Sequence, residues 1–290
     1  MRAIYKKELR SYFTSFLGYL FIAFLLIIVG IYQYLYNLRG EYANFGLAVN
    51  GTTTFFLLLV PMLTMRILAE EKRQRTDQLI FTAPVSVERI VLGKFLALVT
   101  VFAVAVAFIC VYPLILHNYG AVNYSVAYTT IAAFFLLGCT YMAIGMFISS
   151  LTESQVFAAV MTFIVILFTL MIDMLVQMLP TGHVLAFCVL LGLALIVSVI
   201  TYVMMKSKIV TGIVAVLSVG GLAVAYFTDP DRTRFDGSLA KVFGWLSVQS
   251  RFALFPREIV DISSYVYYLS MIFLFVFLTI QAIKKRRWEA

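Results

Sequence analysis

The chain has 290 residues, of which 63% are hydrophobic and only 12% are charged, and its mean hydropathy is +0.99. Soluble globular domains contain about 45–50% apolar and about 25% charged residues. The composition therefore excludes a soluble fold, as well as disordered, collagen-like and disulfide-stapled classes, and predicts an all-α polytopic membrane protein. In such a chain the net charge of +8 reports membrane topology, and no nucleic-acid partner is expected.

Eight apolar stretches are long enough to cross about 30 Å of hydrocarbon. They are residues 15–37, 52–68, 90–116, 126–150, 155–178, 184–205, 209–227 and 264–283. Most Lys and Arg residues fall in segments that are cytoplasmic when both termini are cytoplasmic, so this orientation is favoured. Whether 184–227 forms two full spans or a re-entrant hairpin stays open. The remaining segments are too short for an independent domain, and 15–290 is predicted to be one transmembrane domain.

The first 14 residues have the pattern of an amphipathic helix. Apolar side chains recur at helical spacing, at Ile4, Tyr5, Leu9, Tyr12, Phe13 and Phe16. Basic side chains occupy the other side, at Arg2, Lys6, Lys7 and Arg10. The pattern predicts a helix over 1–14 that lies in the cytoplasmic membrane interface and contacts anionic lipid. An ordinary positive flank that orients the first span explains the same residues equally well.

No sequence motif for catalysis, nucleotide binding or metal binding is found, and no cofactor is expected in this chain. Gly93 and Lys94 do not belong to a phosphate-binding loop, because Glu88 and Phe95 stand where that motif requires Gly and Ser or Thr. Lys94 is therefore predicted to extend its ammonium group back to the lipid headgroups.

Three polar residues within apolar spans are candidates for a translocation pathway: Asp173, Gln177 and Gln33. Ionisable groups inside membrane spans are functional candidates by default. Asp173 lies only seven residues before Pro180, however, so an alternative is that it reaches water at the outer membrane surface.

The segment between the second and third predicted spans is unusually rich in charge. Seven of the twelve residues from Arg66 to Asp77 are charged. Opposite charges recur at helical spacing, in Arg66 with Glu70, Glu71 with Arg75, and Arg73 with Asp77. The pattern predicts a cytoplasmic helix over about 70–83 that ends before Pro84 and displays Leu79 and Phe81. A helix that docks on a soluble partner and a solvated connecting helix are equally compatible with these residues.

This segment resembles the cytoplasmic motif of ABC-2 type exporter permeases, which Glu70, Glu71, Thr76, Leu79 and Pro84 match in order. More specifically, the chain resembles the gliding-motility-type permease branch of that family. The further matching stretches are Lys6–Phe13, Met65–Arg66, Leu92–Phe95, Ser149–Thr152, Tyr267–Ser270 and Lys285–Trp288.

The resemblance implies a transport subunit and not an enzyme, in the plasma membrane of a bacterium. It implies a complex of two permeases, identical or sister chains, with two ATPase subunits that bind ATP and Mg²⁺, and an auxiliary gliding-type membrane-anchored protein as a further partner. The helix at about 70–83 would be the coupling helix. The residues expected to dock and couple the ATPase are Arg66, Glu70, Glu71, Arg73, Arg75, Thr76, Leu79, Phe81 and Pro84.

The chain departs from the family pattern at three points. Arg75 replaces a Gly of the motif, which predicts a helix that continues without interruption, and Gln78 replaces an acidic residue. Family members usually have six spans, and 184–227 is interpreted as an inserted helical pair. The segment 228–263 is predicted to form a cap at the outer surface, although a plain long loop explains it almost as well.

Two other classes of function stay open from the sequence. A polytopic membrane enzyme that acts on lipid would need catalytic side chains from 228–263, and an ATP-independent channel or transporter would need a polar pore. The exported substrate is not specified; an amphipathic or lipidic cargo is favoured by the apolar spans.

Overall fold

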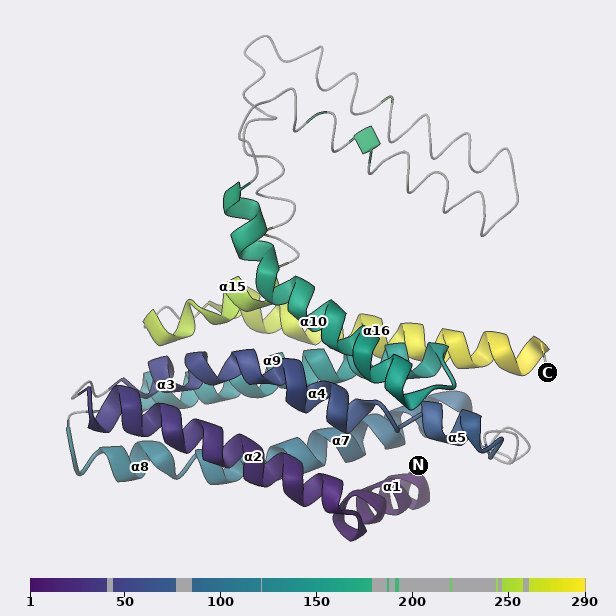
Figure 1. Ribbon diagram of the computed structural model, residues 1–290, viewed down its shortest axis with the longest axis horizontal. Coiled ribbons are helices and arrows are strands. Elements are labelled where there is room, and N and C mark those ends of the chain that lie inside the picture. Colours follow the sequence, from purple (N-terminus) through teal and green to yellow (C-terminus); the bar gives the residue numbers. More distant parts are fainter. Residues whose placement is uncertain are drawn as a thin grey trace. The chain divides into compact units, whose positions relative to one another are not determined.

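The computed structural model describes residues 1–40, 44–76, 85–120, 122–178, 247–257 and 261–289, with the single positions 187, 191, 192, 220 and 244. Within these residues the secondary structure is helical and contains no strand (Figure 1). The elements are α1 (Arg2–Thr14), α2 (Phe16–Gln33), the π-helix η1 (Tyr34–Leu38), α3 (Phe45–Thr52), η2 (Thr53–Phe55), α4 (Phe56–Thr64), α5 (Ala69–Arg73), α7 (Val87–Ile109), α8 (Tyr112–Leu116), α9 (Tyr124–Leu151), α10 (Gln155–Met178), α15 (Val248–Phe252), η4 (Phe255–Arg257) and α16 (Ile262–Glu289).

Six helical stretches in the described part are long and apolar enough to cross a membrane, which confirms an all-α polytopic membrane protein. They are Phe16–Leu38, Phe45–Arg73, Val87–Leu116, Tyr124–Leu151, Gln155–Ile172 and Ile262–Lys285. The second stretch begins earlier than the predicted 52, because α3, η2 and α4 follow one another without a break. The predicted spans 184–205 and 209–227 lie outside the described residues, so the count of eight stays a prediction.

The chain divides into two compact units, Met1–Leu170 with Val248–Ala290, and Met171–Ser247. In the first unit, α9 is the central helix and contacts α16, α4, α7 and α3. The Phe56 ring of α4 packs against Phe102, Phe134 and Tyr141 at centroid distances of 5.8, 4.8 and 6.0 Å. Gly138 makes this packing possible, since a Cβ atom there would lie 2.3 Å from the Phe102 ring. Small residues commonly permit such close helix contacts in membranes.

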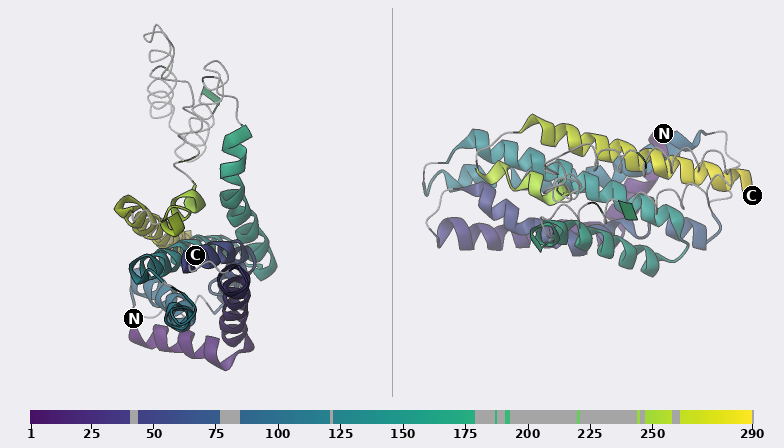
Figure 2. Two further views of the ribbon diagram at one scale, coloured as in Figure 1. Left: turned by 90° about the vertical axis from the view of Figure 1, so that its left-hand side faces the viewer. Right: turned by 90° about the horizontal axis from the view of Figure 1, so that it is seen from above.

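The helix predicted over 1–14 corresponds to α1, and Ser15, in an extended conformation, separates it from α2. α1 packs against α7 and α2, and the Tyr5 hydroxyl lies 3.0 Å from the Thr100 hydroxyl. Part of its apolar side therefore contacts protein. Its placement in the membrane interface stays a prediction. Within the first unit, α1, α5 and the C-terminal end of α16 lie at one end of the bundle, and α3 and α8 lie at the other (Figures 1 and 2).

Candidate functional site

The short helix α5 is attached at its beginning to the central helix α9. The first backbone N–H groups of a helix have no partner within that helix. Here the N–H groups of Leu68 and Ala69 donate to Ser149 Oγ at 3.3 and 3.1 Å, and Ser149 Oγ donates to the Met65 carbonyl at 3.2 Å. A buried serine on α9 thus supplies the cap of α5, although it lies about 80 residues later in the sequence.

α5 ends at Arg73, so the predicted continuous helix over 70–83 is wrong at this point. Arg75 adopts a φ of 55°, in the left-handed region that favours glycine. The Arg75 N–H donates to the Lys72 carbonyl at 3.1 Å and the Thr76 N–H donates to the Glu71 carbonyl at 3.0 Å. This pair of bonds is the Schellman arrangement, which ends many helices. Arg75 therefore adopts a backbone conformation that favours glycine, which carries a steric cost for a residue with a Cβ atom.

The side chain of Lys94 is buried at the junction of α1, α5 and α7, with only 1% of it exposed. Its Nζ lies 3.0 Å from Glu8 Oε1, 2.8 Å from Glu71 Oε1 and 3.0 Å from the Ile67 carbonyl oxygen. An ammonium group has three donors, and three acceptors surround it here. The prediction that Lys94 reaches the lipid headgroups is therefore wrong: two carboxylates compensate its charge inside the protein, so it need not extend to water.

Glu71 also forms an ion pair with a second lysine: Lys7 Nζ on α1 lies 3.6 Å from the same Oε1 atom. The predicted pairing of Glu71 with Arg75 is thus replaced by contacts with α1 and α7. We call Lys7, Glu8, Glu71 and Lys94 the ion cluster. Its two positive and two negative charges balance, and Glu8 and Glu71 are only 12% and 14% exposed. The cluster links three helices that are distant in the sequence.

Arg66 provides a second connection between this region and α1. Its Nε lies 3.4 Å from Glu70 Oε2, which confirms the predicted pair. Its guanidinium group also donates to Ser11 Oγ at 2.8 Å and lies 5.6 Å from the centre of the Tyr12 ring. Tyr12 is buried and donates to the Leu63 carbonyl at 3.0 Å, and burial raises the pKa of its hydroxyl. α1 is therefore held by Arg66, at the start of the charged segment, and by Glu71, near its middle.

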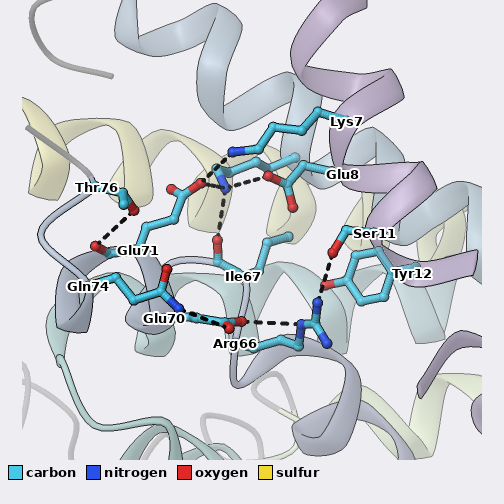
Figure 3. A pocket seen from close by; sticks show the side chains of 11 residues that line it. Lys7, Glu8, Ser11, Tyr12, Arg66, Ile67, Glu70, Glu71, Gln74 and Thr76 are labelled. Atoms are coloured by element: carbon cyan, nitrogen blue, oxygen red, sulfur yellow. Dashed lines mark hydrogen bonds and ion pairs between the residues drawn. The ribbon is translucent and has the colours of Figure 1, made fainter. Parts of the chain in front are cut away.

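The ion cluster and the Arg66 contacts surround a cavity of about 240 Å³ (Figure 3). Figure 3 shows side chains of α1 on one side of it and those of α5 on the other. The lining residues are Lys7, Glu8, Ser11, Tyr12, Arg66, Ile67, Glu70, Glu71, Gln74, Thr76 and Lys94.

The predicted docking residues fall into three groups. Arg66, Glu70, Glu71 and Thr76 come together around the cavity, whereas Arg73 and Arg75 are exposed. Leu79, Phe81 and Pro84 lie outside the described residues.

Of the three predicted pathway residues, only Gln33 has a described side chain, and it does not line this cavity. Gln33 is buried at the end of α2, where its Nε2 donates to the Tyr112 carbonyl at 3.5 Å. Asp173 and Gln177 lie on α10, and their side chains are outside the described part of the structure.

Sequence reasoning missed Glu8, Lys94 and Ser149 as members of this site. Two of them carried a signal: Glu8 is the only acidic residue among the first 40, and no charged residue follows Lys94 until Glu153. A lone acidic residue among basic ones, and a charge at the start of a long apolar run, each suit a buried partner as well as a surface position. Ser149 carried no comparable signal, because its role depends on which turn of α9 faces α5.

The arrangement is suited to holding helices together. Among the described residues, no group of three or more His, Cys, Asp or Glu side chains could hold a metal ion. The ionic contacts join α5 to α1 and α7, and Ser149 joins it to α9, so a displacement of α5 would act on these three helices.

Comparison with known proteins gives one match. The family described as ABC-2 family transporter protein matches residues 34–283 of this chain. No curated protein and no solved structure matches it. The family match covers the charged segment, α5, α7 and α9, and extends to the last span. The chain therefore belongs to the ABC-2 family of transporter proteins.

Proposed function

We propose that this chain is the transmembrane subunit of an ATP-driven exporter and that α5 is the coupling helix where its ATPase docks. The family is that of ABC-2 permeases, which form the membrane part of ABC transporters and work with an ABC ATPase subunit. The observation that carries the proposal is the fixed position of α5, which is joined to α7 through Glu71 and Lys94 and to α9 through Ser149.

The docking surface is assigned to the exposed side of α5. Arg73, the last residue of α5, and the following Gln74 and Arg75 are exposed, at the end of the bundle that also holds α1. Rim charges of this kind set orientation and encounter rate in protein interfaces. Leu79 and Phe81 would add apolar contacts, which usually supply most of the affinity. Closure of the ATPase would displace α5, and the ion cluster would carry that displacement to α1 and α7.

The remaining parts of the proposal follow from the sequence. We propose that both termini lie in the cytoplasm. ATP and Mg²⁺ would bind to two partner ATPase subunits. A second copy or a sister permease completes the membrane part, in a bacterial plasma membrane. The gliding-type branch and its auxiliary membrane-anchored protein are retained as proposals. The cargo is proposed to be amphipathic or lipidic and to move outward, past a cap formed by 228–263. Deletion of 236–255 without any change in transport would refute the cap.

Arg73 is the residue whose charge reversal tests the docking surface, because it is exposed, whereas reversing Glu71 would disrupt the ion cluster and the fold together. We would purify the tagged chain in mild detergent, identify co-purifying proteins by mass spectrometry and measure ATP hydrolysis. Arg73→Glu is expected to reduce the recovered ATPase several-fold, and the control Arg10→Glu, an exposed residue on α1, to leave it unchanged.

The result that would overturn the proposal is recovery of the chain alone, without a nucleotide-binding partner even after cross-linking. The function would then be assigned to a membrane enzyme or an ATP-independent channel. If Arg73→Glu and Arg10→Glu reduced the recovered ATPase equally, the overall positive charge at this end of the bundle, and not α5, would determine ATPase binding.

A further inference from the structure

A second cavity, of about 750 Å³, is lined by a different set of side chains at the same end of the bundle. It lies where α5, the turn between α9 and α10, and the last turns of α16 come together. The lining residues are Lys72, Phe147, Ser150, Leu151, Glu153, Leu278, Gln281, Ala282 and Lys285. None of these residues belongs to the cavity beside the ion cluster.

The spans themselves place this cavity at the level of the lipid headgroups. Three of the apolar stretches end at its lining: Phe45–Arg73, Tyr124–Leu151 and Ile262–Lys285. A span ends where hydrocarbon gives way to the polar headgroup region. A cavity lined by the last residues of three spans therefore opens into that region.

The polar part of the cavity has an excess of positive charge. Lys72 and Lys285 line it together with one acidic residue, Glu153. The Lys72 ammonium group donates to the Ser150 carbonyl, which fixes it at the cavity wall. The adjacent Lys284 forms an ion pair with Glu88 of α7, and Arg286 and Arg287 follow it in the sequence. Basic pockets between helices at a membrane surface are typical sites for anionic lipid headgroups.

The apolar part of the cavity continues along α16 into the bilayer. Leu274, Leu278, Gln281 and Lys285 are spaced so that they share one face of this helix. Leu274 is 45% exposed, and Leu151 on α9 is 63% exposed. A ligand with its polar group between the lysines would thus have an uncovered apolar strip for its hydrocarbon chain.

We propose that this cavity binds an anionic phospholipid, with its phosphate group between Lys72 and Lys285 and an acyl chain along Leu274 and Leu278. Lys72 is part of α5, so a lipid bound here contacts the proposed coupling helix directly. Occupancy of the site is therefore expected to increase ATP hydrolysis by the complex. This last step rests on the proposed function, whereas the binding step does not.

Binding is tested on the purified full chain in detergent by titration with phosphatidylglycerol, with bound lipid counted by native mass spectrometry. The double variant Lys72→Gln, Lys285→Gln is expected to weaken phosphatidylglycerol binding about tenfold. The control Arg2→Gln, Lys6→Gln removes two exposed basic groups of α1 and should change binding less than twofold. Gln281→Glu, an exposed position that adds a negative charge, should also weaken binding if the double variant does not fold.

Unchanged phosphatidylglycerol binding in both cavity variants would overturn the proposal, and so would equal binding of zwitterionic phosphatidylcholine. Inorganic phosphate that binds alone and displaces the lipid at millimolar concentration would identify free phosphate as the ligand and also overturn it. If the cavity variants lose lipid binding but ATP hydrolysis by the complex does not change, the lipid site stands and the coupling role of α5 is contradicted.

Discussion

The two ends of the first unit stabilise their buried polar groups in different ways. At the α1 and α5 end, the ion cluster pairs ionised side chains, with Lys94 in contact with two carboxylates. At the α3 end, neutral amides connect the helices: Asn44 Nδ2 donates to the Pro256 carbonyl at 3.0 Å, and Gln249 Nε2 donates to Thr53 Oγ1 at 2.6 Å. Each arrangement joins segments that are far apart in the sequence.

The ends also differ in how completely these groups are satisfied. Lys94 has an acceptor for each of its three donors. At the other end, the amide oxygens of Gln33, Asn50 and Gln249 have no hydrogen-bond partner among the described residues. A neutral group without a partner costs much less than a buried charge without one. The ionic end is therefore expected to tolerate substitution of its buried polar groups poorly, and the amide end to tolerate substitution of its buried polar groups well.

The largest effect is expected from Lys94→Met. This change leaves Glu8 and Glu71 facing each other without the ammonium group, and breaking a buried ion pair from one side costs about 3–5 kcal/mol. We expect a strong loss of stability in detergent, measured by denaturant unfolding. Adding Glu8→Gln and Glu71→Gln to the same chain should restore most of it. Wild-type stability of Lys94→Met would refute the buried pairing.

A smaller effect is expected from Gly46→Ala at the amide end. The new Cβ atom would lie 2.9 Å from Pro256 Cα and 3.0 Å from Asn44 Oδ1, so α3 would have to move away from η4. Overpacking of this kind costs about 1–3 kcal/mol. The same unfolding measurement checks it, with Gly192→Ala as the control, since no atom of the described residues lies within 4 Å of a Cβ there. Equal effects of the two changes would exclude a close contact at Gly46.

Ser149→Ala tests the attachment of α5 to α9. It removes the acceptor of two backbone N–H groups, and loss of a helix cap costs about 1 kcal/mol. We expect a modest loss of global stability together with faster amide hydrogen exchange at Leu68 and Ala69. Ser149→Thr keeps the hydroxyl and should retain slow exchange. Unchanged exchange in Ser149→Ala would mean that water or another group caps α5.

The smallest effect is expected from Gln249→Leu. The change removes one hydrogen bond to Thr53, but it also removes an amide oxygen that has no described partner. These contributions oppose each other, and we expect a change within about 0.5 kcal/mol. A loss as large as that of Lys94→Met would refute the contrast between the two ends.

Much of the fold could be predicted from the sequence, because a membrane span is a local property of about 20 consecutive residues. The predicted first span, 15–37, agrees with Phe16–Leu38, and the predicted last span, 264–283, lies within Ile262–Lys285. The pair Arg66–Glu70 was also predictable, since residues four apart on a helix are neighbours.

Only the tertiary structure decided how the charged segment is held. Lys94 turns inward because Glu8 and Glu71 arrive there from two other helices, and no sequence spacing reveals that meeting. Arg75 takes a glycine conformation because bonds to Glu71 and Lys72 end the helix. The apolar spans follow from the favourable free energy of transferring each segment into lipid, which depends on that segment alone. The buried charges depend instead on partners that only the folded chain brings within 3 Å.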